Sequence, residues 1–143
     1  MSDFILRRHY PVKVDYWASE HEVVQPANLD VKYTIGVGHN KTNPLDWRVQ
    51  LTVVFSARHQ NEDTIKGTVV FVGYFLLPDV IPEADRTNFA ARNGASVLYS
   101  ATRELVAYIS CRSANRNITL PLAVFNEVKI DPKDVTGEVE VQV

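Results

Sequence analysis

Residues 47–77 read WRVQLTVVFSARHQNEDTIKGTVVFVGYFLL, and much of the architecture follows from the pattern within them. From Trp47 to Ala57 the odd positions are all apolar, and the even positions are polar with the exception of Val54. Alternation with period two is typical of a strand that buries one face. The sequence HQNED at 59–63 has turn chemistry, so a further antiparallel strand is expected to follow directly.

The strand expected at 68–77 is apolar on both faces. One face carries Val69, Phe71, Phe75 and Leu77, and the other carries Val70, Val72, Tyr74 and Leu76. A strand of this kind needs cover on both sides. The chain offers only a short helix after Pro82 and a longer one, which is too little for both faces of a sheet. We therefore expect another copy of the chain, or a partner, to cover the second face, and we expect a homo-oligomer, with a tetramer as its size.

Other segments have the same period of two. They lie at 4–16, with an interruption at Arg8, and at 31–37, which is followed by a turn sequence at 38–44. The tail has a strand pattern as well, because valines at 139, 141 and 143 alternate with Glu and Gln. We favour a sheet-edge role for this tail, with occupation of a binding groove as the alternative. No linker or internal repeat divides the chain, so residues 1–143 are expected to form a single domain.

The longer helix is expected over 95–111, after Asn93-Gly94 ends the short one. Its apolar residues have helical spacing and form one stripe: Leu98, Ala101, Leu105, Tyr108 and Ile109. Arg103 and Glu104 lie off this stripe. They are either a solvated pair on the outside of the helix or part of a contact with a second subunit, and the residues alone favour the solvated pair.

Composition limits the possible functions. Apolar residues make up 45% of the chain and charged residues 22%, as in globular proteins. The formal charge of −2 argues against nucleic acid as the main partner. A single cysteine fits a reducing compartment, and no segment has the length of a signal peptide core or of a membrane span. We expect a cytoplasmic protein without a membrane partner.

No catalytic or metal-binding pattern is found in the sequence. The four histidines are widely separated and lack ligand spacing, so no metal site is expected. Cys111 follows the helix stripe with no histidine or carboxylate nearby in sequence, which favours a buried or half-buried structural thiol over a nucleophile. Gly36 and Gly38 are not followed by a phosphate-binding loop. We therefore expect neither an enzyme nor a cofactor.

Residues 98–125, LYSATRELVAYISCRSANRNITLPLAVF, resemble the SecB family of export chaperones, whose corresponding segment reads roughly LFPYAREx7RGxFPxLNLAPVNF. The two segments align without a gap and share Leu98, Arg103, Glu104, Arg112, Leu120 and Phe125. Shorter matches occur in the same order along the chain. They are an FxxxRxY-like start at 4–10, a crossover-like loop at 25–30 and a GIF-like strand end at 73–75.

The resemblance implies an α+β fold in which a four-stranded antiparallel sheet, a meander with a crossover loop, packs with one long helix. It also implies a dimer of dimers in which the helix lies between subunits. This implication favours an interface role for Arg103 and Glu104. The residues expected at the oligomer interface are Val70, Val72, Tyr74, Leu98, Arg103 and Glu104.

Several departures from the family pattern remove the link to secretion. Export members carry acidic residues that dock the translocation motor SecA, and the aligned positions here are Lys13, Trp17, Lys66 and Thr68. The tryptophan of the crossover loop aligns with Val24, and the C-terminal amphipathic helix and acidic tail of the family are absent. SecA binding is therefore doubtful.

We predict a SecB-like holdase that captures extended apolar polypeptide, and we expect its client to be the antitoxin of a toxin–antitoxin module. Aromatic and branched side chains would give the groove affinity without sequence specificity. The residues expected to line it are Tyr16, Trp17, Val23, Val24, Leu120, Leu122 and Phe125. For each of them ordinary core or loop packing is the alternative, and for Leu120 and Phe125 the two interpretations have equal weight. The alternatives are a divergent general export chaperone that hands preproteins to SecA, and a structural or adaptor subunit with the same fold.

Overall fold

The structure, a computed structural model, describes residues 3–19, 29–112 and 118–131, and the backbone of 138–141. Its elements in chain order are the strands β1 (Ile5–Ala18), β2 (Leu29–His39), β3 (Asp46–His59) and β4 (Glu62–Leu76), the short 3-10 helix η1 (Glu83–Asp85), the helix α1 (Arg86–Ser110) and the strand β5 (Glu138–Val141).

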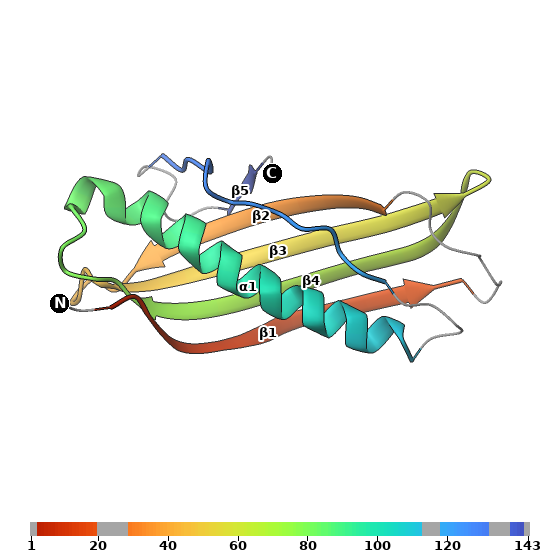
Figure 1. Ribbon diagram of the computed structural model, residues 1–143, viewed down its shortest axis with the longest axis horizontal. Coiled ribbons are helices and arrows are strands. Elements are labelled where there is room, and N and C mark those ends of the chain that lie inside the picture. Colours follow the sequence, from red (N-terminus) through yellow and green to blue (C-terminus); the bar gives the residue numbers. More distant parts are fainter. Residues whose placement is uncertain (1–2, 20–28, 113–117, 132–137, 142–143) are drawn as a thin grey trace.

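The strands form one antiparallel sheet in the order β1-β4-β3-β2-β5 (Figure 1). β2, β3 and β4 form the predicted meander, in which consecutive strands pair. β1 pairs with β4, so β1 and the next strand in the chain, β2, lie on opposite sides of β3 and β4. The predicted sheet of four antiparallel strands is confirmed. The short β5 pairs with the outer edge of β2, as favoured for the tail.

The alternation in 47–57 is confirmed, because every odd residue from Trp47 to Ala57 is buried. These side chains face α1, which lies across one face of the sheet (Figure 1). β3 and β4 are joined by a two-residue turn in which Gln60 and Asn61 have φ values of 51° and 64°. Two successive left-handed residues match the twist of the flanking strands, so the turn fits a tight hairpin.

The predicted division into two helices is wrong. α1 is a single helix of 25 residues that passes through Asn93-Gly94 without a break, and the short η1 directly precedes it. Gly94 is buried against β3, and a Cβ atom placed on it would lie 2.7 Å from Val49 Cγ2. The glycine therefore serves the close approach of helix and sheet rather than ending a helix.

Residues 118–131 form an extended segment that runs alongside α1 over the same face of the sheet (Figure 1). Its residues Ile118, Leu120, Phe125, Val128 and Ile130 are buried in the core. α1 and this segment together cover one face of the sheet.

The opposite face, which we call the outer face, is not covered by any helix among the described residues. Val70 is 9% exposed and Val72 is fully buried, because side chains of the neighbouring strands surround them on this face. Their apolar character is thus accommodated within one chain. The homo-oligomer remains a prediction.

The Gly94 contact predicts the effect of Gly94→Ala. Alanine in a helix interior normally stabilises by about 1 kcal/mol relative to glycine. Here we expect a net destabilisation of about 1–3 kcal/mol, because the added Cβ would overlap Val49. Urea unfolding of Gly94→Ala measures this, and the double variant with Val49→Ala should recover part of the loss. A more stable Gly94→Ala protein would contradict the account of α1 packing.

Candidate functional site

A row of polar side chains on α1 holds the backbone of the 118–131 segment. Near one end of the row the Ser110 hydroxyl accepts from Ile118 N–H at 2.8 Å, and Arg103 Nε donates to the Leu120 carbonyl at 3.1 Å. The Tyr99 hydroxyl donates to the Pro121 carbonyl at 2.6 Å. Arg92 Nε donates to the Val128 carbonyl at 2.7 Å, and Asn88 Oδ1 accepts from Ile130 N–H, also at 2.7 Å.

These five positions follow the helical repeat. Asn88, Arg92, Tyr99, Arg103 and Ser110 are separated by steps of four and seven residues, which place them along one side of a helix. All five contact main-chain atoms of the extended segment, so the contacts do not depend on its side chains. α1 can therefore hold an extended polypeptide with little regard to sequence. Sequence reasoning missed this row, although the spacing of its polar residues is a visible signal.

Tyr99 is the centre of the arrangement. Its ring packs edge to face on Phe125 and Tyr33, with ring centroids 5.7 Å and 5.4 Å away. Its hydroxyl donates to Pro121 and lies 3.3 Å from the Tyr33 hydroxyl, which can donate to it. Burial, followed by the contact with Tyr33, raises the pKa of Tyr99 far above its usual range. Tyr99 thus stays neutral, and its contacts with Tyr33 and Phe125 join β2, α1 and the 118–131 segment.

The sheet edge beside this segment holds a second extended strand. β5 pairs with β2 antiparallel over Tyr33 to Gly36, whereas β2 spans Leu29–His39. Within the described chain, 29–32 and 37–39 have no ladder partner on this edge. An unpaired strand edge presents N–H and C=O groups to any extended chain.

The predicted client-binding residues are not all on one surface. Leu122 is exposed over 83% of its area, and Val124 beside it over 66%, whereas Leu120 and Phe125 are fully buried in the core. Tyr16 is half-buried and packs on the core from the α1 side. Trp17 lies on the outer face. Val23 and Val24 lie outside the described residues.

The predicted interface residues are likewise divided. Val70, Val72 and Tyr74 lie on the outer face, whereas Leu98 is fully buried in the core of the same chain. Arg103 is half-buried and donates a hydrogen bond to the Leu120 carbonyl. Neither prediction for Arg103, a solvated pair with Glu104 or a contact with a second subunit, included this bond. Glu104 is exposed. Arg103 thus has a role within one chain.

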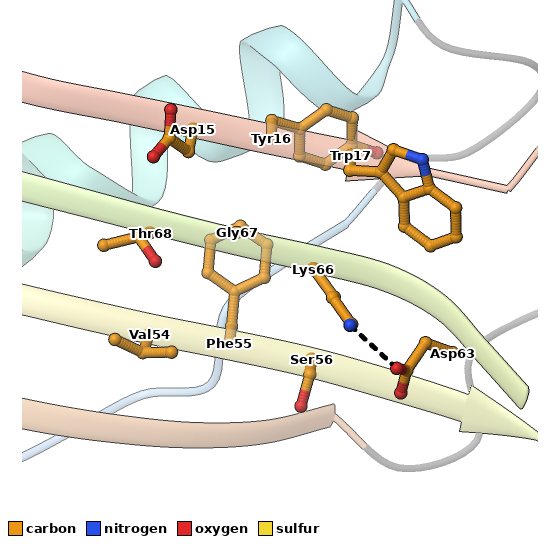
Figure 2. A pocket seen from close by; sticks show the side chains of 10 residues that line it. All are labelled: Asp15, Tyr16, Trp17, Val54, Phe55, Ser56, Asp63, Lys66, Gly67 and Thr68. Carbon is orange, nitrogen blue, oxygen red and sulfur yellow. Dashed lines mark ion pairs between the residues drawn. The ribbon is translucent and has the colours of Figure 1, made fainter. Parts of the chain in front are cut away.

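The outer face carries a hollow of about 500 Å³ near the end of β1 (Figure 2). Trp17 and Val54, 49% and 41% exposed, contribute its apolar surface. Tyr16, Gly67 and Phe55, which are direct cross-strand partners, also line it. A Cβ on Gly67 would lie 2.1 Å from Phe55 Cζ, so glycine is needed beneath that ring. The hollow suits an apolar side chain with charged neighbours.

The positions that depart from the SecA-docking pattern also lie on the outer face. Two carboxylates near these positions are paired: Lys13 Nζ lies 3.4 Å from Asp15, and Lys66 Nζ lies 2.9 Å from Asp63. The hydrogen bond from Lys66 lowers the pKa of Asp63, and Arg58 acts in the same direction. The face therefore presents no unpaired acidic group at these positions.

No group of three or more His, Cys, Asp or Glu side chains in the described ranges is placed to hold a metal ion. Cys111 is exposed, so the prediction of a buried or half-buried thiol is wrong. The helix ends there, and the side chain turns back to hydrogen bond with the Tyr108 carbonyl. No described helix has the length and apolar character of a membrane span.

Comparison with known proteins identifies the fold. No protein-family model matches the sequence, and no curated protein matches it significantly. The structure is similar to the SecB-like chaperone Rv1957 of Mycobacterium tuberculosis, solved in complex with a ChAD peptide from the Rv1956 HigA1 antitoxin. The TM-score is 0.67 at 21% sequence identity, and the match covers 84% of this chain and 90% of that chain.

A protein of unknown function from Streptococcus agalactiae is also similar, with a TM-score of 0.48 and 15% identity over 84% of this chain and 98% of that chain. The similarity to the SecB-like chaperone shows that this chain has a SecB-like fold. The fold expected from residues 98–125 is thereby confirmed.

The tyrosine contacts predict the effect of Tyr99→Phe. We expect a loss of about 1–3 kcal/mol in the free energy of unfolding, because the Pro121 carbonyl and the Tyr33 hydroxyl would lose their partner. Tyr108→Phe, at an exposed tyrosine of α1, is the matched control and should change stability by less than about 0.5 kcal/mol. Urea unfolding measures both variants.

A pH titration tests the same contact. Because the folded-state pKa of Tyr99 is raised, its contribution is present below the unfolded value of 10.0 and is lost as the pH rises above it. The wild-type protein should therefore lose stability more steeply above pH 10 than Tyr99→Phe does. Equal slopes for the two proteins would show that Tyr99 is not held neutral by its surroundings.

Proposed function

We propose that this protein is a SecB-like chaperone, a holdase that binds extended polypeptide. The observation that carries the proposal is the antiparallel pairing of β5 with the edge of β2 over Tyr33 to Gly36. This edge accepts an extended segment through main-chain hydrogen bonds, which any client sequence can supply. The SecB-like fold supports the same function.

The surroundings of the β2 edge suit an apolar client. Leu122 and Val124 are exposed, and they shortly precede Phe125, whose ring lies 5.7 Å from that of Tyr33 on β2. Exposed branched side chains beside an unpaired edge add affinity to main-chain pairing. The client surface proposed here combines the β2 edge with Leu122 and Val124. Leu120 and Phe125 support it from the core, whereas Tyr16 lies on β1 at the opposite edge of the sheet.

We propose that the client is a labile antitoxin. The structurally similar Rv1957 was solved with a peptide from an antitoxin, and this supports a polypeptide client of that class. The paired carboxylates at Lys13 and Lys66 favour this dedicated role over hand-over to SecA, because no free acidic surface remains at those positions.

The tail predicts a competition between β5 and the client. If both use the β2 edge, deletion of residues 138–143 should strengthen client binding by about fivefold, which corresponds to about 1 kcal/mol for displacing a few main-chain hydrogen bonds. Deletion of residues 142–143 alone leaves β5 intact and is the matched control. Fluorescence anisotropy with labelled, reduced and carboxymethylated α-lactalbumin measures the affinity.

Weaker binding by the longer deletion, with an unchanged control, would show that β5 completes the client surface instead of occupying it. Unchanged binding by both deletions would place the client away from the β2 edge.

A further inference from the structure

Three side chains form a row across the outer face, at the opposite end of β4 from the Trp17 hollow. Arg8 of β1 and Arg48 of β3 are the direct cross-strand partners of Tyr74 of β4. Directly opposed residues share a face, so the two guanidinium groups flank the tyrosine. Arg8 Cζ lies 4.4 Å from the centre of the Tyr74 ring and 5.9 Å from that of Tyr10. We call Arg8, Tyr74 and Arg48 the arginine–tyrosine row.

The positive charge of this row is not balanced by an ion pair. Arg7, Lys13, Arg58 and Lys66 each pair with a carboxylate, but Arg8 and Arg48 take part in no ion pair within the described residues. Arg48 Nη2 donates to Gln50 Oε1 at 3.0 Å, which leaves its charge in place. Both arginines are exposed. Two flanking cations favour an anion that contacts both.

The effect of this charge is visible at Tyr74. The hydrogen bond from Tyr10 is the main cause that lowers the pKa of Tyr74, and Arg48 and Arg8 lower it further, against the effect of burial. The site is thus electropositive next to an aromatic surface.

Two hollows of about 350 and 300 Å³ adjoin the row, and both are lined by Tyr74 and Asp46. Asp46 Oδ2 accepts from Arg7 at 3.2 Å, whereas Asp46 Oδ1 is buried and accepts no hydrogen bond from the described residues. A buried carboxylate oxygen without a hydrogen-bond donor lowers the stability of the fold. Rotation of the Asp46 carboxylate would expose this oxygen to an incoming N–H group. A peptide carries both N–H groups and carboxylates, whereas a phosphodiester backbone lacks the N–H groups.

We propose that the arginine–tyrosine row binds an acidic segment of a partner protein, whose Asp or Glu side chains contact Arg8 and Arg48. The exposed apolar side chains of Ile5 and Tyr10 beside the row, and the formal charge of −2 of the chain, favour protein over nucleic acid. A second copy packed face to face about a two-fold axis through the row would oppose arginine with arginine. The site goes beyond the proposed chaperone function and lies away from the β2 edge.

The test compares two labelled synthetic peptides, one alternating Glu with Leu and one alternating Gln with Leu. We expect the Glu peptide to bind the full chain about tenfold more tightly than the Gln peptide at low salt, and this difference to vanish at high salt. The Arg8→Gln/Arg48→Gln variant should lose the difference. Arg58→Gln, an exposed arginine at the far end of the sheet, is the matched control and should keep it.

Equal affinity for the two peptides in the wild type would overturn the proposal without requiring any variant. The proposal would also be overturned if the Arg58→Gln control lost the difference in affinity between the two peptides to the same extent. Tighter binding of a single-stranded DNA oligonucleotide than of the Glu peptide would overturn it as well. A lower mass of the double variant in light scattering would also overturn it, by assigning the row to a second copy. At high salt, where attraction to the row is screened, capture of unfolded α-lactalbumin should be the same in the double variant and the wild type, so failure here is distinguishable from failure of the chaperone function.

Discussion

The contact of Gly94 with Val49 brings α1 close to the middle of the sheet, and the other features of the molecule depend on that approach. A close helix seals the core on one face together with the 118–131 segment. It also turns Asn88, Arg92, Tyr99, Arg103 and Ser110 towards that segment. The opposite face and the β2 edge are then left for other chains. One tight contact thus commits one face of the sheet to the core.

Both extended segments of this chain are held through their backbones. The 118–131 segment is bound by side chains of α1, and β5 is bound by the ladder of β2. Recognition of main-chain atoms gives affinity without sequence specificity, which a holdase requires. Specificity for one class of partner needs side-chain chemistry, and the arginine–tyrosine row on the outer face supplies a charge pattern for it.

Strands were predictable from sequence because their period of two is a local signal. The positions at 31–37 and 47–57 lie in observed strands, and so do those at 68–77 except Leu77. The helix boundary could not be predicted from sequence. Gly94 has the local chemistry of a helix end, whereas its packing against Val49 depends on the tertiary fold. The same holds for the site. Leu120 and Phe125 have the character of groove residues, but only the folded structure shows that they are covered, whereas Leu122 is exposed.

Hydrogen–deuterium exchange of the full chain, with and without reduced and carboxymethylated α-lactalbumin, tests the central claim that clients add to the β2 edge. The account predicts slower exchange of backbone amides in 29–32 and 37–39, the parts of β2 that β5 leaves unpaired on this edge. Exchange in β1 and β4, which lie at the other side of the sheet from the β2 edge, should be unchanged. Protection confined to β1 and β4, or no protection of β2 at saturating client, would contradict it.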